Sequence, residues 1–229
     1  MIISTKAIVL RKIKYSDSSL IVDTFTDFEG RKSFFIKGIL GKTKGKIKNS
    51  HFQPLSQILI KYNKREKKKI NFLIECKINR HCQNIYLDYR KSSIILFLNE
   101  ILNMCMVEEA RNKELFCFLE SSLKWLDNNN KISNFHILFI LKLLKYLGIN
   151  PHLKSSNSKF LSFESGSFED EKPNGLHAEG ESVMTIISLL GMKFDDCFSL
   201  KVSQVQKHEI LKILLEYIEY HVQGFKQPK

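Results

Sequence analysis

The sequence lacks the long apolar stretches that mark membrane proteins. No run approaches the roughly 18 uninterrupted apolar residues that indicate a membrane-spanning helix. The N-terminus also lacks the charged, apolar and small-residue regions of a secretory signal peptide. We therefore expect a soluble, intracellular protein with no membrane partner.

Compact enzyme motifs are missing as well. The chain has no Gly-x-x-x-x-Gly-Lys-Ser/Thr phosphate loop, no His-Glu-x-x-His and no Gly-x-Ser-x-Gly. Four acids near the N-terminus offer the ligands of a metal-dependent nuclease: Asp17, Asp23, Asp27 and Glu29. Two of them fall in an expected turn, where acids are common for backbone reasons. We predict a protein that is not an enzyme, with no cofactor or metal, and keep a nuclease as the minor alternative.

Cysteine is sparse and odd in number. Several of the five cysteines lie in helix or strand patterns, where cysteine behaves as a small hydrophobic residue. We predict free, buried thiols rather than disulfides or a metal site at Cys76, Cys82, Cys105, Cys117 and Cys197.

Positive charge is present in excess, and it is confined to one end of the chain. Residues 1–80 hold 19 Lys and Arg against 6 Asp and Glu, whereas the whole chain has a net charge of +12. The excess concentrates in two clusters, residues 42–48 and 64–69. Charge this uneven indicates a polyanionic partner, and nucleic acid is the leading candidate.

Five short segments rich in β-branched and aromatic residues surround these clusters. They cover residues 7–10, 20–25, 33–36, 57–62 and 70–74. Gly30 follows the second segment and can take the positive φ of a tight hairpin. Five short strands in about 75 residues predict a small barrel, naturally an oligonucleotide-binding (OB) barrel. An SH3-like barrel satisfies the same strand count.

Near residue 80 the apolar period changes from two to about 3.6, which predicts helices. Apolar stripes cover residues 94–105, 115–126 and 135–147, and further helical patterns cover 181–190 and 203–222. Ser133 is the expected N-cap of the third helix and Gly148 its stop, while Ser203 opens a capping box. Residues 152–177 lose periodicity. The sequence thus predicts an α+β protein, with a basic barrel over residues 1–80 and an all-helical domain with an irregular insertion over 81–229.

Seven aromatic residues of the expected barrel are candidates for stacking on nucleobases. They are Tyr15, Phe28, Phe34, Phe35, Phe52, Tyr62 and Phe72. Most must be core. Phe34 and Phe35 are neighbours on a strand and point to opposite faces, but the sequence does not say which of them faces outward. Phe28, in the turn, is the best exposed candidate.

Several of these segments resemble, in order and spacing, the N-terminal domain of RecO, a family of bacterial recombination mediators. These segments are residues 7–11, 15–22, 25–31, 35–38 and 52–55. Further along the chain, residues 134–151 resemble the RecO helix that ends in Leu-Gly before a nearby Pro. The resemblance implies an OB-fold followed by a helical domain. It also implies a non-enzymatic, cytoplasmic and nucleoid-associated role: binding single- and double-stranded DNA, annealing complementary strands and helping to load RecA. RecR and single-stranded-DNA-binding protein (SSB) are the implied partners.

Two departures from the family pattern matter. Many RecO proteins carry a four-cysteine zinc site after the Leu-Gly helix, but residues 149–190 contain no Cys, so we expect this chain to fold without zinc. The family often reads Lys-Gly-Ala-Arg after the third strand, where this chain has Lys37, Gly38, Ile39 and Leu40. Lys37 carries over as a DNA contact, and Lys42 or Lys44 is expected to replace the missing Arg.

These observations predict a DNA-binding set of cations and one aromatic residue: Arg11, Lys12, Lys14, Arg31, Lys37, Lys42, Lys44, Lys46, Lys48, Lys64, Arg65, Lys67, Lys68, Lys69 and Phe28. An RNA-binding or ribosome-associated OB protein is a further alternative, since a groove that follows the backbone does not exclude RNA. For the acidic, apolar tail of SSB, the candidate surface comprises Lys142, Lys145, Phe135 and Phe139.

Overall fold

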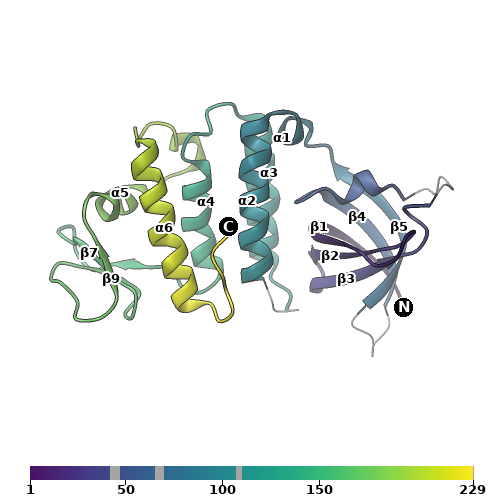
Figure 1. The fold of residues 1–229 in the computed structure, drawn as a ribbon, viewed down its shortest axis with the longest axis horizontal. Helices are drawn as coiled ribbons and strands as arrows, with labels where there is room; N and C mark the ends of the chain where they lie inside the picture. The colour runs from purple at the N-terminus through teal and green to yellow at the C-terminus, as the bar shows by residue number, and fades with distance from the viewer. Residues whose placement is uncertain (42–46, 65–69, 107–109, 229) are drawn as a thin grey trace. The chain divides into compact units, whose positions relative to one another are not determined.

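The computed structural model describes residues 1–41, 47–64, 70–106 and 110–228. They form two compact units, Met1–Asn128 and Asn129–Lys229. The first unit contains the barrel and three α-helices, and the second contains the remaining helices and a small sheet (Figure 1). No helix among the described residues is long and apolar enough to cross a membrane.

Five strands close into a barrel in the order β1-β2-β3-β5-β4. Among the described residues of the barrel, β3 and β5 pair in parallel and the other four pairings are antiparallel. This Greek-key closure is OB-like, as predicted. The strands are β1 (Ile2–Lys14), β2 (Leu20–Thr26), β3 (Gly30–Ile36), β4 (Gln57–Asn63) and β5 (Ile70–Arg80).

Alternate side chains of these strands fill the barrel. Phe34 and Tyr62 are almost fully buried, with ring centroids 4.9 Å apart, and burying each such ring contributes about 1.5–3 kcal/mol. Gly30 has the positive φ, 67°, that the turn between β2 and β3 requires. Phe52 lies in the same core.

Helices α2 and α3 belong to the same compact unit as the barrel. The Asn103 side chain donates to the Leu10 carbonyl at 2.6 Å, and Lys6 Nζ pairs with Glu120 Oε1 at 3.0 Å. Residue 80 marks the change from strands to helices, whereas the compact units divide after residue 128. The helices of this unit are η1 (Asn49–Phe52), α1 (Gln83–Leu87), α2 (Tyr89–Cys105) and α3 (Lys113–Asn128).

The second unit is built around helix α4 (Phe135–Tyr146), most of whose side chains are buried. Gly148, with φ of 74°, ends this helix as predicted. The predicted N-cap is wrong: Asn134 occupies that position, and its side chain donates instead to the carbonyls of Cys197 and Leu200. The other helices are α5 (Glu181–Leu189), η2 (Phe194–Asp196) and α6 (Gln204–His221). Ser203 caps α6 as predicted, but the predicted capping box is only half formed, because the Gln206 side chain donates to Thr185 Oγ1.

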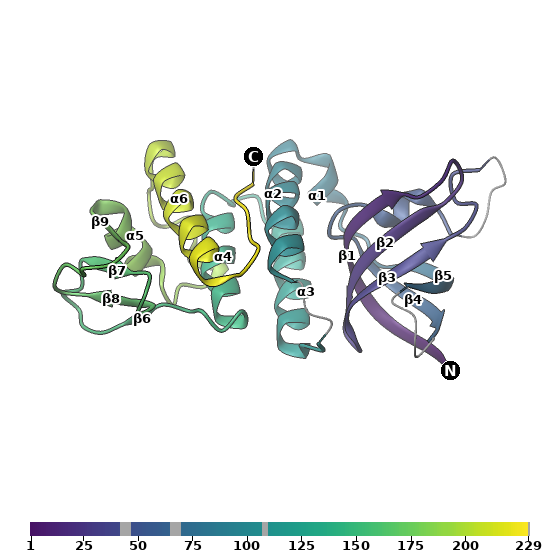
Figure 2. The ribbon, with the colours of Figure 1, turned by 60° about the horizontal axis from the view of Figure 1, so that its bottom comes forward.

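The second unit is not all-helical, because the segment predicted to be irregular forms a four-stranded sheet (Figure 2). Its strands pair in the order β6-β8-β7-β9, and β7 and β8 form an antiparallel hairpin. Strands of two or three residues are too short for alternation to show in the sequence, and the buried side chains of Leu161, Phe163 and Phe168 hold them in place. The strands are β6 (His152–Leu153), β7 (Phe160–Ser162), β8 (Ser167–Glu169) and β9 (His177–Glu179).

Hydroxyl groups and carboxylates tie this sheet together. Ser155 and Ser158 donate to Asp170 Oδ1 at 2.6 and 2.9 Å, and Glu169 Oε1 accepts from Lys154 Nζ at 2.7 Å. Among the described residues, no three His, Cys, Asp or Glu side chains are grouped to hold a metal. Zinc-free folding stays a prediction, which elemental analysis of the purified protein would test.

All five cysteines are free thiols. Cys76, Cys82 and Cys197 are buried and Cys105 is partly exposed, but Cys117 is exposed. The prediction of burial is wrong for Cys117, which lies on the outer side of α3 between the buried residues Phe116 and Phe118.

The sheet of the second unit should be sensitive to acid. Hydrogen bonds from Lys154, Ser165 and Ser167 lower the pKa of Glu169 from 4.5 to about 2. A lowered pKa in the folded state means that the stabilisation is complete above pH 4.5 and is lost as the pH falls towards 2. We expect the amide hydrogen-exchange protection factors of residues 152–179, which compare observed with intrinsic rates, to fall over this range. Glu169→Gln should flatten the dependence, and an unchanged dependence in that variant would contradict this role.

Candidate nucleic-acid interface

An apolar row crosses the outer face of the barrel. Ile13 pairs with Ile21, Ile21 with Phe35, and Phe35 with Phe72, so one residue from each of four strands lies in register. Phe34, the neighbour of Phe35, points into the core, and the alternation of strand side chains therefore turns Phe35 outward. The question that the sequence left open is thus answered in favour of Phe35.

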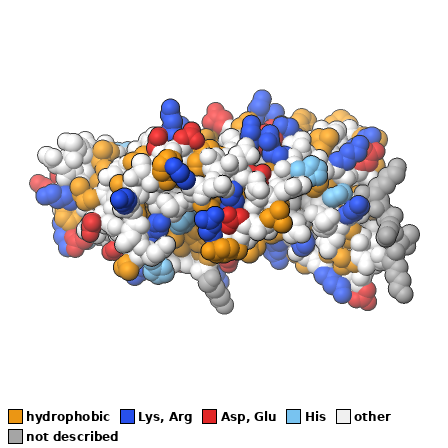
Figure 3. Space-filling model, turned by 90° about the horizontal axis from the view of Figure 1, so that it is seen from above, with side chains coloured by type: hydrophobic (Ala, Val, Ile, Leu, Met, Phe, Trp, Pro, Cys, Tyr) orange, Lys and Arg blue, Asp and Glu red, His pale blue; other side chains and the backbone are white. Residues whose placement is uncertain are grey.

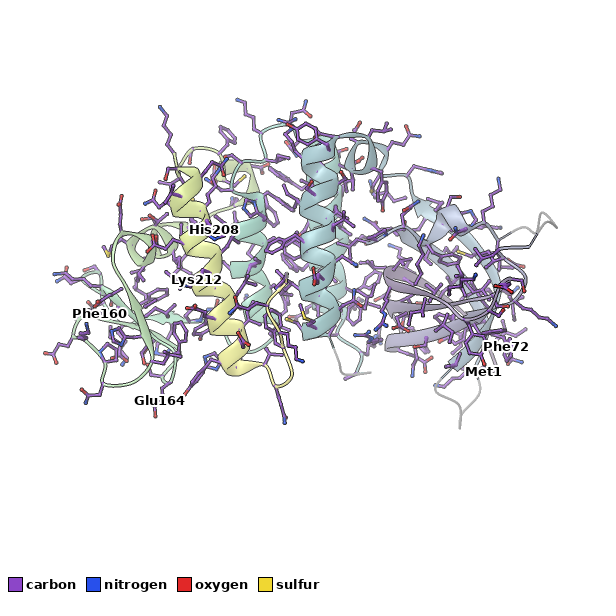
Figure 4. All side chains as sticks on the ribbon, in the orientation of Figure 1. Met1, Phe72, Phe160, Glu164, His208 and Lys212 are labelled. Atoms are coloured by element: carbon purple, nitrogen blue, oxygen red, sulfur yellow. The ribbon has the colours of Figure 1, made fainter. Side chains whose placement is uncertain are left out.

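Three aromatic rings form a continuous surface along this row. Tyr15 follows β1 and meets Phe35 edge-on with centroids 5.3 Å apart, and Phe35 meets Phe72 in the same way at 5.5 Å. Tyr15 is 65% exposed and Phe72 is 43% exposed. Figure 4 labels Phe72 on the barrel. Exposed rings at this spacing provide faces and edges on which successive nucleobases can stack. We call Tyr15, Phe35 and Phe72 the aromatic row.

Cations lie next to the aromatic row. Lys14 immediately precedes Tyr15 in the sequence. It pairs with Leu20 on β2, and Leu20 pairs with Ile36 on β3. Lys37 follows Ile36 and therefore lies at the same end of these strands. Lys37 is exposed, and so is Lys14, whose Nζ lies 3.1 Å from Asp17. Such an exposed pair is worth only about 0–1 kcal/mol, so a phosphate can replace the carboxylate. Two further predicted contacts, Arg11 and Lys12, are exposed on β1.

Two other predicted cations have partners within the protein. Arg31 donates to the carbonyls of Asn103 and Met106 at 2.9 and 2.8 Å and pairs with Asp23, which favours a structural role for it. Lys64 is hydrogen-bonded to Glu29. Burial would raise the pKa of Glu29, but its hydrogen bonds with Lys64 and Tyr62 lower it overall, so the carboxylate is charged and holds Lys64 in place.

The turn residue Phe28 is 45% exposed, as expected, but one side of its ring has a neighbour. The guanidinium of Arg111 lies 5.8 Å from the ring centroid, and Arg111 Nε donates to the Asp27 carbonyl at 3.0 Å. Arg111 was not predicted, because its relation to the turn depends on a contact across 84 residues. It adds a cation beside an exposed ring.

Of the remaining predicted contacts, only Lys48 lies within the described residues. Lys48 is exposed at the start of η1. Seven predicted cations lie outside the described residues: Lys42, Lys44, Lys46, Arg65, Lys67, Lys68 and Lys69. Their part in DNA binding stays a prediction.

The four carboxylates of the nuclease alternative do not form a shared site. Asp23 Oδ1 accepts from Ser33 at 2.6 Å and its Oδ2 pairs with Arg31, while Asp17 pairs with Lys14. Glu29 is engaged by Lys64 and Tyr62. Among the described residues no metal-ligating group includes them, so the arrangement gives the nuclease reading no support.

The surface suggested for the SSB tail is incorrect. Phe135 and Phe139 are both fully buried, because α4 lies within the core of the second unit. The Nζ atom of Lys142 lies 5.7 Å from the ring centroid of Phe194. The helical pattern showed that one side of α4 is apolar but could not show that its other sides are covered too.

The closed barrel and the exposed rings place the first unit among OB-like domains. Family models identify both parts of the sequence: "Recombination protein O N terminal" matches residues 1–81 and "Recombination protein O C terminal" matches residues 86–229. The chain belongs to the RecO family of DNA repair proteins.

Full-length relatives agree with this assignment. The chain is 37% identical to the DNA repair protein RecO of Christiangramia forsetii and 36% identical to that of Flavobacterium psychrophilum. In both comparisons the match covers 100% of this chain and 96% of the relative. The chain is also 31% identical to the DNA repair protein RecO of Phocaeicola vulgatus, and that match covers 98% of this chain and 94% of the relative.

Proposed function

We propose that this chain is a recombination mediator that binds single- and double-stranded DNA and anneals complementary strands. In this role it assists RecA loading on DNA coated by SSB, with RecR and SSB as partners, in the cytoplasm at the nucleoid. The observation that carries the proposal is the aromatic row with exposed lysines beside it. Membership in a family of DNA repair proteins favours DNA over the RNA alternative.

The chemistry of this activity is binding rather than bond cleavage. Lysine and arginine neutralise phosphates, and the release of counterions supplies much of the affinity. Stacking on the aromatic row adds affinity without reading sequence, because every base has a π-face. When phosphates on two strands are neutralised, their mutual repulsion falls. Base stacking then drives duplex formation, so annealing needs no cofactor.

Removing exposed rings tests the aromatic row directly. The double variant Tyr15→Ala/Phe72→Ala should weaken single-stranded DNA binding by about 1–3 kcal/mol for each base that loses its stacking partner. Fluorescence anisotropy with a labelled oligonucleotide measures the loss. The matched control is Tyr89→Ala/Tyr220→Ala, which removes two exposed rings elsewhere, 78% and 50% exposed. Equal losses in both variants would show that the aromatic row is not the site.

Binding should depend steeply on salt. If about six phosphates are neutralised, log K for single-stranded DNA should fall with log salt at a slope of roughly −4, from about −0.7 per phosphate. Titrations at several NaCl concentrations give this slope. A slope near zero would be incompatible with binding through phosphates.

The first basic cluster can be separated from net charge by a matched pair of fourfold variants. Lys42, Lys44, Lys46 and Lys48 changed to Ala should weaken DNA binding and slow annealing, with stability changed by less than about 0.5 kcal/mol per site. Each lost phosphate contact should make the salt slope for single-stranded DNA shallower by about 0.7.

The control removes the same charge elsewhere, by changing Lys113, Lys124, Lys131 and Lys193 to Ala. DNA affinity should fall much less. Equal losses in the two variants would mean that net charge alone is responsible, and that residues 1–80 hold no particular site.

A further inference from the structure

The first unit contains a cavity of about 320 Å³ that the aromatic row does not use. Its walls come from η1, the start of β4, the end of β5 and the start of α1. Phe72 of the aromatic row and Arg80 of the cavity are eight residues apart on β5, roughly 25 Å along an extended strand. The cavity is therefore a separate place on the barrel.

The cavity is lined by basic groups. Lys48, Arg80, His51 and His81 contribute to it, and none of the described side chains that line it is acidic. In Figure 3 histidines are exposed close to Lys and Arg side chains on the barrel part of the face seen from above. Burial lowers the pKa of His51, and the charge of Lys48 lowers it further. The lowered pKa of His51 favours its neutral form, so the positive charge at the cavity comes from Arg80 and Lys48, and this charge favours an anion.

One residue of the cavity lining, Gln57, has a buried polar atom without a partner among the described residues. Gln57 is 3% exposed, and its Nε2 donates weakly to Cys82 Sγ at 3.9 Å. Its Oε1 is buried and accepts no hydrogen bond from any described residue. A buried acceptor left unsatisfied is costly, so a ligand that presents an N–H group there would be favoured.

The wall beside Gln57 is fixed before any ligand arrives. Tyr86 Oη donates to the Pro54 carbonyl at 2.9 Å and lies 3.2 Å from Ser56 Oγ. Leu55 has a φ of 58°, which is strained for a leucine, and its N–H donates to the Val9 carbonyl at 2.8 Å. Strain held by surrounding bonds is typical of sites that are organised in advance.

We propose that this cavity binds one nucleotide. Arg80 and Lys48 hold its phosphate, and Gln57 Oε1 accepts from an N–H of its base. Each of the four bases carries such a donor on its Watson–Crick edge, so the site does not select among them. The nucleotide comes either from solution or from a DNA strand. In the second case the barrel holds nucleic acid at two places, as the pairing of two strands requires.

Calorimetric titration of the full chain tests the cavity with three probes: deoxyadenosine monophosphate (dAMP), deoxyadenosine and inorganic phosphate. dAMP should bind more tightly than either of the others. Arg80→Ala should weaken dAMP and phosphate binding roughly tenfold, as expected for the loss of a hydrogen bond to a charged group. Gln57→Met should weaken dAMP and deoxyadenosine but leave phosphate unchanged. Lys77→Ala, an exposed β5 residue outside the cavity, is the control.

Three results would contradict nucleotide binding in this cavity. Absence of dAMP binding at millimolar concentration, dAMP binding no tighter than phosphate, or equal effects of Arg80→Ala and Lys77→Ala would each overturn the proposal. If Gln57→Met fails to fold, the comparisons of probes and of the Arg80 and Lys77 variants still decide. Displacement of dAMP by a short oligonucleotide identifies DNA as the source, and lack of displacement identifies the free nucleotide. The Tyr15/Phe72 variant should leave dAMP binding intact, which separates this site from the proposed DNA-binding face.

Discussion

The closure of the barrel is the constraint on which the candidate interface depends. Strand side chains alternate, so the pairing that buries Phe34 against Tyr62 also sets Phe35 on the outer face between Ile21 and Phe72. A slip of one residue would exchange core and surface along the whole of β3. The packing of the core therefore determines which aromatic side chains face outward, and the burial that stabilises the fold also stabilises the register of the aromatic row.

The excess positive charge of the first unit has two physical roles. Arg31 joins the barrel to the end of α2 through two carbonyls, and Lys64 is held by a charged Glu29 within the barrel. Lys14 and Lys37, by contrast, are exposed near the aromatic row, and phosphates can compete for them. Composition indicates a polyanionic partner, but contacts decide which cations remain available for it.

The barrel class and most helix ends could be predicted from sequence, but individual contacts between residues far apart in the chain could not. The ends of helices at Gly148 and Ser203 follow from backbone freedom and capping within a few residues. In the sequence Arg31 looks like a free cation that could contact DNA. Its actual acceptors are backbone carbonyls more than 70 residues later in the chain, and the sequence gives no sign of them. The choice between Phe34 and Phe35 requires the register of the closed barrel, and the sheet of residues 152–179 has strands too short for a periodic signal.

Photo-crosslinking tests the central claim most directly. Single-stranded DNA carrying 5-iodouracil, irradiated in complex with the full chain, forms covalent bonds with aromatic side chains that stack on its bases. Mass spectrometry of the digested product then identifies the peptides that carry the DNA. We predict crosslinks at Tyr15, Phe35 or Phe72. Crosslinks confined to residues 129–229, with none in the barrel, would contradict the account.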